Sequence, residues 1–304
     1  MKAQESINTI IGEMQNVFLG QEDVVKHVLC TLLASGHILI EGVPGIGKTL
    51  IGLTLSRLLS LSFRRIQFTN DMLPSDVIGF HMFRKGSVEP NLIKGPVFAS
   101  VVLADEINRT SPKTQSALLE AMEEGQVSID GITYSLSNPF MIIATQNPVE
   151  IAGTFPLPES QLDRFLIKTS VGYPPAQAEK EIILKDIDHR HALNLSPVMD
   201  RDSIIRLRSY VSRVGVHPDV LDYIISIIRD TRAHPKIELG ASPRGGLALK
   251  RASQAWAFIH GRDYITPGDV LKMVVPVLAH RITTKEADPA GVLEEITRTI
   301  TVPV

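Results

Sequence analysis

Five short segments rich in apolar residues recur through the first half of the chain, and longer segments with helical periodicity lie between them. Strands that are buried on both faces of a parallel sheet read as nearly continuous apolar runs. Strands that alternate with helices are typical of a parallel sheet covered by helices. The pattern therefore predicts an α/β fold whose strand candidates are residues 37–41, 63–68, 101–104, 140–146 and 165–171.

The pattern changes after the last of these strands. Tyr173-Pro174-Pro175 can continue neither a strand nor a helix, so it marks a boundary. Beyond it the apolar positions have helical spacing, for example in residues 218–232. The sequence thus predicts two domains, an α/β domain over residues 1–172 and an all-helical domain over residues 173–304.

Helix and hairpin signals precede the fourth strand candidate. The segment 111–125 begins with a Ser-Pro pair and ends in glycine, so it is predicted to be a helix. Apolar and polar residues then alternate on both sides of Asp130-Gly131, which is a strong signal for a two-residue β-hairpin. This hairpin carries no Lys or Arg between residues 127 and 136.

Composition narrows the class of protein. The chain has 304 residues, of which 44% are hydrophobic, enough for a sizeable core and more than one domain. Its formal net charge of -2 weighs against a dedicated nucleic-acid-binding protein, because such proteins are usually basic. The single cysteine, Cys30, excludes an internal disulfide and is expected to be a small buried residue on a helix. The first residues lack the apolar core of a signal peptide and no apolar run could span a bilayer, so we expect a cytoplasmic protein.

A glycine-rich loop follows the first strand candidate. It fits the spacing G-x-x-x-x-G-K-[ST], and apolar residues at helical spacing follow it. Glycines let successive backbone N–H groups turn inward around an anion, and the N-terminus of the next helix adds a partial positive charge. In this context Lys48 is expected to reach the β- and γ-phosphates of a nucleotide, and the Thr49 hydroxyl to ligate Mg²⁺. The residues expected to bind the nucleotide are Gly42, Val43, Pro44, Gly45, Ile46, Gly47, Lys48, Thr49 and Leu50.

Two carboxylates end the third strand candidate. Asp105 and Glu106 would be costly at the end of a buried strand unless they faced a cation or water. We expect Asp105 to hold the Mg²⁺ shell and Glu106 to polarise the attacking water; a solvated strand end is the alternative. Ligands of parallel α/β sheets bind beyond the carboxyl ends of the strands, where Asn147 follows the fourth strand. Asn147 is expected to orient the lytic water or to contact the γ-phosphate, unless it only forms a turn before the next proline.

Longer motifs carry a family resemblance. The segments GVPGIGKT, ADEINRTSPKTQSALLEAMEE, ATQNP, GTFPLPESQLDRF and ASPRGG stand in the order found in the MoxR family of AAA+ ATPases, which the chain resembles over nearly its whole length. The resemblance implies a AAA+ P-loop domain with a parallel sheet of strand order 5-1-4-3-2, β-hairpin inserts and a small all-α lid. A second hairpin is implied within residues 76–98. The resemblance assigns Lys48 and Thr49 to Walker A, Asp105 and Glu106 to Walker B, and Asn147 to sensor 1.

Two arginines also receive roles from the resemblance. Arg164 would be the arginine finger that acts on the nucleotide of a neighbouring subunit, and Arg244 the sensor 2 residue that acts on the nucleotide of its own chain. From the residues alone, Arg164 could simply pair with Asp163, and Arg244 could be a solvated arginine. Gln21 is implied to lie beside the adenine. Arg109 either faces a neighbouring subunit or packs on the helix that follows it.

By this resemblance we expect a Mg²⁺-dependent ATPase that works as an oligomeric ring, in particular a hexamer, and that remodels partner proteins in a chaperone-like way. The implied partner is often a protein with a von Willebrand factor A domain, and the implied cofactors are ATP and Mg²⁺. One alternative is a nucleic-acid motor of the same superfamily, against which the net charge and the absence of Lys and Arg from the hairpin count. The other is a nucleotide-gated scaffold with little turnover, against which the presence of both Glu106 and Arg164 counts.

Overall fold

The computed structural model describes residues 2–43, 45–83, 90–147, 153–185, 189–286 and 288–303. Pro44 of the glycine-rich loop lies outside these residues, and so does the tip of the second expected hairpin, residues 84–89. None of the described helices is both long and apolar enough to cross a membrane.

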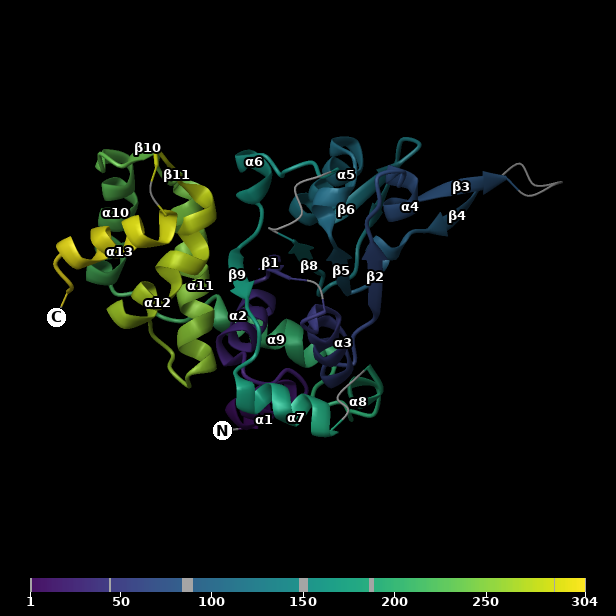
Figure 1. Cartoon of the computed structure of the whole chain (residues 1–304), viewed down its shortest axis with the longest axis horizontal. Coiled ribbons are helices and arrows are strands. Elements are labelled where there is room, and N and C mark those ends of the chain that lie inside the picture. Colours follow the sequence, from purple (N-terminus) through teal and green to yellow (C-terminus); the bar gives the residue numbers. More distant parts are fainter. Residues whose placement is uncertain are drawn as a thin grey trace.

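A five-stranded parallel sheet forms the centre of the molecule (Figure 1). Its strands in spatial order are β2 (Phe63–Gln67), β5 (Val101–Asp105), β8 (Met141–Gln146), β1 (Ile38–Gly42) and β9 (Ile167–Val171). Counted along the chain and read from β9, this is the expected order 5-1-4-3-2. Each strand begins and ends within two residues of its predicted bounds. Because the strands are parallel, their carboxyl ends share one edge, the carboxyl edge, and their starts share the opposite amino edge.

Helices cover both faces of this sheet. Successive side chains of a strand point to opposite faces, so Ile38 and Ile40 pack with one set of helices and Leu39 packs with another. Burial of both faces explains why the inner strands are apolar throughout. The first face is covered by α1 (Lys2–Val17), α2 (Glu22–Leu33) and α3 (Lys48–Leu58), and the second by α4 (Pro74–Ile78) and α5 (Pro112–Glu124).

The chain after β9 is mainly helical, as predicted. A bundle of the last helices lies beside the β9 edge (Figure 1), whereas α7 and α8 lie near α1 and α3, and α8 contacts α3 directly. Because these helices pack back on the α/β part, the division at residues 172 and 173 stays a proposal. The helices are α7 (Ala176–Lys185), α8 (His189–Leu193), α9 (Arg201–Val211), α10 (Pro218–Ala233), α11 (Pro243–Ile259), α12 (Pro267–Leu278) and α13 (Pro289–Thr299), with the short strands β10 (Ile237–Leu239) and β11 (Thr283–Thr284).

Two hairpins leave the α/β part of the molecule, as expected. In one, Asp130 and Gly131 have φ angles of 50° and 81°, the positive values that a type I′ turn requires. The other projects away from the body (Figure 1). His81 joins the two hairpins, because its ring nitrogens lie 2.8 Å from the Asp130 carboxylate and 2.8 Å from the Tyr134 hydroxyl. The strands are β6 (Gln126–Ile129) and β7 (Ile132–Ser135) in the first hairpin, and β3 (Gly79–Phe83) and β4 (Pro90–Lys94) in the second.

Side chains cap the helices where the sequence predicts it. The Ser111 hydroxyl accepts a hydrogen bond from the backbone of α5, and the Ser242 hydroxyl accepts one from the backbone of α11. Thr266 and Asp269 form a capping box at the start of α12. These caps fix where each helix begins. The remaining short helices are α6 (Glu159–Leu162), η1 (Pro96–Phe98), η2 (Ile107–Arg109) and η3 (Ala279–Arg281).

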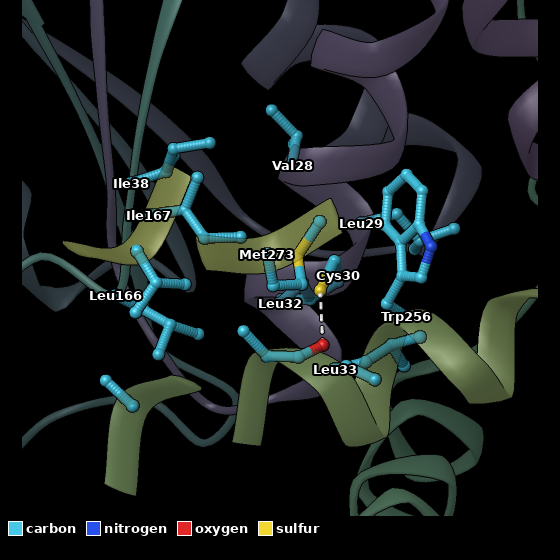
Figure 2. Packing of buried hydrophobic residues seen from close by; sticks show 14 of the residues in the cluster. Val28, Leu29, Cys30, Leu32, Leu33, Ile38, Leu166, Ile167, Trp256 and Met273 are labelled. Carbon is cyan, nitrogen blue, oxygen red and sulfur yellow. Dashed lines mark hydrogen bonds between the residues drawn. The ribbon is translucent and has the colours of Figure 1, made fainter. Parts of the chain in front are cut away.

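Cys30 lies where α2 joins the sheet to the helical bundle (Figure 2). Its side chain is fully buried, and its thiol donates a hydrogen bond to the backbone oxygen of Ala252 on α11 at 3.3 Å. Burial raises the pKa of the thiol well above its ordinary value. Cys30 is therefore an unreactive packing residue, as expected, and Trp256 and Met273 from the bundle pack in the same core.

Candidate active site

The glycine-rich loop joins β1 to α3 at the carboxyl edge of the sheet. Gly45 and Gly47 have φ angles of 85° and 84°, which glycine adopts without steric cost. At Gly42 a Cβ atom would stand 2.6 Å from the backbone oxygen of Val171 in β9. Backbone conformation and close approach therefore explain the glycines that the sequence pattern picked out.

Lys48 opens α3 and is buried at the base of the loop. Its Nζ atom donates a hydrogen bond to the backbone oxygen of Gly42 at 2.7 Å. Burial lowers the pKa of its ammonium group, and the negative charges of Asp105 and Glu106 oppose that shift. The lysine therefore lies within electrostatic range of both carboxylates, so the loop and the strand end belong to one site.

Thr145 on β8 links the two carboxylate residues. Its hydroxyl donates to Oδ1 of Asp105 at 2.6 Å and accepts a hydrogen bond from the backbone N–H of Glu106 at 2.9 Å. Glu106 has a φ angle of 58°, which is uncommon for a residue other than glycine. Backbone strain of this kind, on the order of 1–3 kcal/mol, clusters at functional sites. Sequence analysis did not single out Thr145, which follows the apolar residues of its strand.

Further side chains hold the same two carboxylates. Arg65 on β2 donates to Oδ2 of Asp105 from Nε at 3.2 Å and from Nη2 at 2.7 Å. Oε2 of Glu106 accepts hydrogen bonds from Gln67 at 2.9 Å and from Nη1 of Arg109 at 3.0 Å. Sequence analysis missed Arg65 and Gln67, because their place at the site depends on the register of β2 against β5. Arg109, whose role the sequence left open, contacts Glu106.

The oxygen donors at this edge fit a magnesium ion. Mg²⁺ keeps several waters and takes only one or two carboxylates alongside the phosphates of its substrate. Asp105 ends β5, Thr49 lies in the first turn of α3, and Asn147 directly follows β8, so all three lie at the carboxyl edge. The part of the chain that the structure describes has no cluster of three or more His, Cys, Asp or Glu residues suited to a metal ion. The donor set therefore suits a metal shared with a phosphate rather than an all-protein cage.

A cavity of about 330 Å³ opens beside the loop. Gln21 lines it, and its amide nitrogen donates to the backbone oxygen of Gly172 at 3.2 Å. Phe18, Tyr173 and Ile183 give the cavity an apolar wall, and the last two are exposed by 75% and 73%. Flat apolar surface next to a phosphate loop is suited to a nucleotide base. Sequence analysis implied Gln21 there but took Tyr173 only as a boundary marker.

Arg164 and Arg244 lie at the amino edge of the sheet. Both line a second cavity of about 330 Å³, together with His37, the residue before β1. From His37 to Gly42 the strand rises by five residues at ~3.3 Å each, which places this cavity ~16 Å from the start of the loop. Glu123 joins the two arginines, with Oε2 at 3.2 Å from Nη2 of Arg164 and Oε1 at 2.5 Å from Nη2 of Arg244.

The expectation that Arg244 acts on the nucleotide of its own chain stays a prediction. The Arg244 guanidinium pairs with Glu123 at the edge opposite to Lys48, and α11 is held there by its packing against α2 and α12. The alternative pairing of Arg164 with Asp163 is replaced. Asp163 lies 2.7 Å from Nε of Arg281, whereas Arg164 turns toward Glu123.

Comparison with known proteins identifies the family. Residues 37–167 match the ATPase family associated with various cellular activities (AAA), and residues 229–300 match the AAA lid domain. The chain is 38% identical to Chaperone MoxR1 of Mycobacterium tuberculosis, over 98% of this chain and 82% of that protein. The chain belongs to the MoxR family of AAA+ ATPases. It is also 43% identical to the uncharacterised protein YeaC of Bacillus subtilis, over 100% of this chain and 98% of that one.

A solved structure agrees with this MoxR-family assignment. The crystal structure of a proposed ATPase from Cytophaga hutchinsonii matches with a TM-score of 0.91 at 36% identity, over 99% of this chain and 96% of that chain. The family and the fold class expected from the sequence are therefore confirmed. This MoxR-family chain carries its loop and carboxylates at one edge of the sheet and its two arginines at the other.

Proposed function

We propose that this MoxR-family chain is a Mg²⁺-dependent ATPase that works as a ring, in particular a hexamer, and remodels partner proteins. The observation that carries the hydrolytic part is the convergence of Lys48 with Asp105 and Glu106 at one sheet edge. A buried ammonium group beside two carboxylates suits a triphosphate with its metal ion. The loop glycines add the backbone N–H groups that such a ligand needs.

In this proposal each residue at the carboxyl edge has a separate task. Lys48 neutralises charge on the β- and γ-phosphates, and Thr49 and Asp105 hold Mg²⁺, which when bound offsets charge that develops on the phosphate oxygens. Glu106 accepts a hydrogen bond from the attacking water and polarises it. Asn147 orients that water or contacts the γ-phosphate.

Gln67 and Arg109 help to set the direction of the Glu106 side chain. Both donate to the same carboxylate oxygen, Oε2, so the other oxygen stays available for water. The left-handed backbone at Glu106 turns the side chain off the strand end, and Thr145 supports that turn.

The positions of the arginines support action between subunits. Arg164 and Arg244 lie too far from the loop of their own chain to reach its nucleotide, so both are proposed to act on a neighbour's nucleotide in a head-to-tail ring. Arginines supplied across an interface stabilise charge on the transferring phosphoryl group and can contribute roughly 10³–10⁵ in rate. In this proposal both arginines share one role toward the neighbour's nucleotide, in place of the action in cis that the resemblance implies for Arg244.

The remodelling role rests on different support. One relative is named a chaperone, and the two hairpins joined by His81 give the ring a projecting element that could transmit movement to a client. The proposed client is a protein with a von Willebrand factor A domain, as the family resemblance implies. Phe80 and Met82 on β3 are 46% and 43% exposed and offer apolar contacts for such a client.

The test is Glu106→Gln, measured beside the wild type. The variant keeps the shape of the side chain but cannot accept a proton, so we expect its steady-state ATPase rate to fall by at least ~10²-fold. Binding of ATP with Mg²⁺, measured by calorimetry, should remain within a few-fold because Lys48 and the loop are intact. Equal hydrolysis by both proteins would contradict the role of Glu106.

The same assay separates the two alternatives. A wild type that binds ATP but shows no turnover would support a nucleotide-gated scaffold. Stimulation of the ATPase by DNA, together with salt-dependent binding to DNA, would support a nucleic-acid motor. Capture of a client by the Glu106→Gln protein with ATP, followed by its release from wild type on hydrolysis, would support remodelling.

A further inference from the structure

Glu123 stands between the two arginines at the amino edge, in the last turn of α5. Each of its carboxylate oxygens serves a different guanidinium: Oε2 faces Arg164 at 3.2 Å and Oε1 faces Arg244 at 2.5 Å. Arg164 also donates to the backbone oxygen of Leu119, one turn earlier in α5, at 2.6 Å. The C-terminal turn of one helix thus holds both arginines, and the negative end of its dipole favours them there.

Electrostatics make this carboxylate necessary. Arg164, Arg244 and Arg281 all line one cavity, and like charges at this distance repel one another. Asp163 accepts a hydrogen bond from Nε of the buried Arg281 at 2.7 Å and also lies 4.0 Å from Nη1 of Arg244, so Glu123 is the carboxylate in direct contact with both Arg164 and Arg244. Hydrogen bonding from Arg244 lowers the pKa of Glu123, so the carboxylate stays ionised at neutral pH. The three arginines outnumber the two carboxylates, so the group keeps a net positive charge and can bind an anion.

The three residues also come from different parts of the chain. Arg164 precedes β9 and Glu123 ends α5 in the α/β part, whereas Arg244 begins α11 in the helical bundle. Arg244 is 53% exposed, and its guanidinium lies 2.5 Å from Glu123 and, at the longer distance of 4.0 Å, faces Asp163. An exposed ion pair is ordinarily worth little in stability. The ion pair between Glu123 and Arg244 instead determines position, because it holds Arg244 of the helical bundle next to Arg164 of the α/β part.

We propose that Glu123 is a positioning residue that holds Arg164 and Arg244 together as one receiver for the γ-phosphate of ATP bound to a neighbouring copy of this chain. This inference rests on the proposed function. When the phosphate binds, its oxygens accept hydrogen bonds from the guanidinium N–H groups that point away from Glu123. The Glu123 carboxylate keeps the two guanidinium groups at a fixed position relative to each other. Without Glu123 the arginines move apart and Arg244 turns into solvent.

The first test is Glu123→Ala, with Glu124→Ala as the matched control, because Glu124 is an exposed neighbour on the same turn. Misplacement of catalytic groups by about 1 Å can cost 10²-fold, so we expect the ATPase kcat of Glu123→Ala to fall by about 10- to 100-fold. The KM for ATP should change little, since the loop of the same chain is untouched. Glu124→Ala should match the wild type. A normal kcat for Glu123→Ala would overturn the inference.

The ATPase activity of mixtures of two variants distinguishes a positioning role of Glu123 from a merely structural one. Glu106→Gln chains have an inactive pocket and intact arginines, whereas Glu123→Ala chains have an intact pocket and misplaced arginines. In equal mixtures about a quarter of the head-to-tail interfaces pair an intact pocket with intact arginines. Activity of the mixture should therefore exceed that of either variant alone. If Glu123 acted on its own pocket or only on folding, mixing would restore nothing, and the inference would fail.

A parallel mixture tells this failure apart from failure of the proposed function. Arg164→Ala mixed with Glu106→Gln should recover activity in the same way. If that mixture recovers and the Glu123→Ala mixture does not, the inference alone is wrong. If neither recovers, action across the interface is wrong. In addition, Glu123→Ala should have no further effect on kcat in an Arg164→Ala, Arg244→Ala background, because nothing remains for it to position; a further loss there would also contradict the inference.

Discussion

Asp269 secures the start of α12, and its loss should destabilise the helical bundle that carries Arg244. Its carboxylate is nearly fully buried and accepts hydrogen bonds from both terminal nitrogens of Arg262, one of them at 2.6 Å. It also accepts hydrogen bonds from the backbone N–H of Thr266 at 2.8 Å and from the Thr266 hydroxyl at 2.7 Å. Asp269→Asn keeps the shape of the side chain, removes its charge and turns an NH₂ group toward these donors.

The size of the effect follows from these contacts. Removing one partner of a buried ion pair costs about 3–5 kcal/mol, because the other charge is left uncompensated. Arg262 is 30% exposed, so water recovers part of that loss. We therefore expect Asp269→Asn to lower the free energy of unfolding at pH 7 by about 2–3 kcal/mol. For a chain of this size that corresponds to roughly 3–5 °C in Tm.

The dependence on pH tests the same reasoning. Burial opposes ionisation of Asp269, but hydrogen bonds from Arg262 and Thr266 outweigh it, so the pKa of Asp269 lies below its ordinary value. A group whose pKa is lowered by folding contributes stability that is present above its unfolded pKa and is lost as the pH falls through its folded pKa. The difference between wild type and Asp269→Asn should therefore be constant from about pH 8 to about pH 5 and shrink below about pH 4.

Urea denaturation followed by tryptophan fluorescence measures this difference, because the single tryptophan, Trp256, lies on α11 and α11 packs against α12. The matched control is Asp263→Asn, an exposed aspartate that precedes the same helix. The control should stay within about 0.5 kcal/mol of the wild type, as surface substitutions usually do. An equally small change for Asp269→Asn at pH 7, or a difference that persists unchanged down to pH 3, would refute the reasoning.

Two further predictions concern the nucleotide site. Arg65→Gln removes a partly exposed ion pair from Asp105, and because such pairs contribute ~0.2–1 kcal/mol, the Mg²⁺ concentration for half-maximal ATPase activity should fall by roughly 1.5- to 5-fold. A Mg²⁺ titration at saturating ATP measures this, and a rise would mean that Arg65 orients Asp105 rather than competing for it. Tyr173→Ala removes a ring that is 75% exposed, so folding should not change. The KM for ATP should rise about 5-fold or more, since stacking of a base on an aromatic ring contributes ~1–3 kcal/mol; an unchanged KM would exclude Tyr173 from the base pocket.

Local signals in the sequence were sufficient for most of the fold. The run Val101–Asp105 is buried on both faces, so its apolar character predicts a central strand directly. Asp130-Gly131 predicts a hairpin because few other residue pairs accept positive φ at both positions. Ser111 and Ser242 mark helix starts because the cap needs only a hydroxyl and the next turn of the backbone. Each of these predictions depends only on residues that are close together in the sequence.

The same local signals could not predict contacts between segments that are far apart in the sequence. Arg65 meets Asp105 only because β2 pairs with β5 in one register, and a shift by one residue would turn its side chain to the other face. The Ser242 cap predicts where α11 begins but not which edge of the sheet it faces. That choice follows from the packing of Trp256 and Met273 around Cys30 of α2, which no local pattern encodes (Figure 2).

The placement of α11 changes how the whole site is understood. With Arg244 at the amino edge, one chain holds two incomplete sites: a loop with its carboxylates at one edge, and a pair of arginines held by Glu123 at the other. Each lacks what the other supplies, since a triphosphate brings the negative charge that the arginine pair can bind. Under the proposed function, a single chain has what it needs to bind a nucleotide, and head-to-tail association would complete the set of groups for hydrolysis. In the proposed ring, a nucleotide in one loop would affect the position of a neighbour's helical bundle, because Arg244 belongs to that bundle.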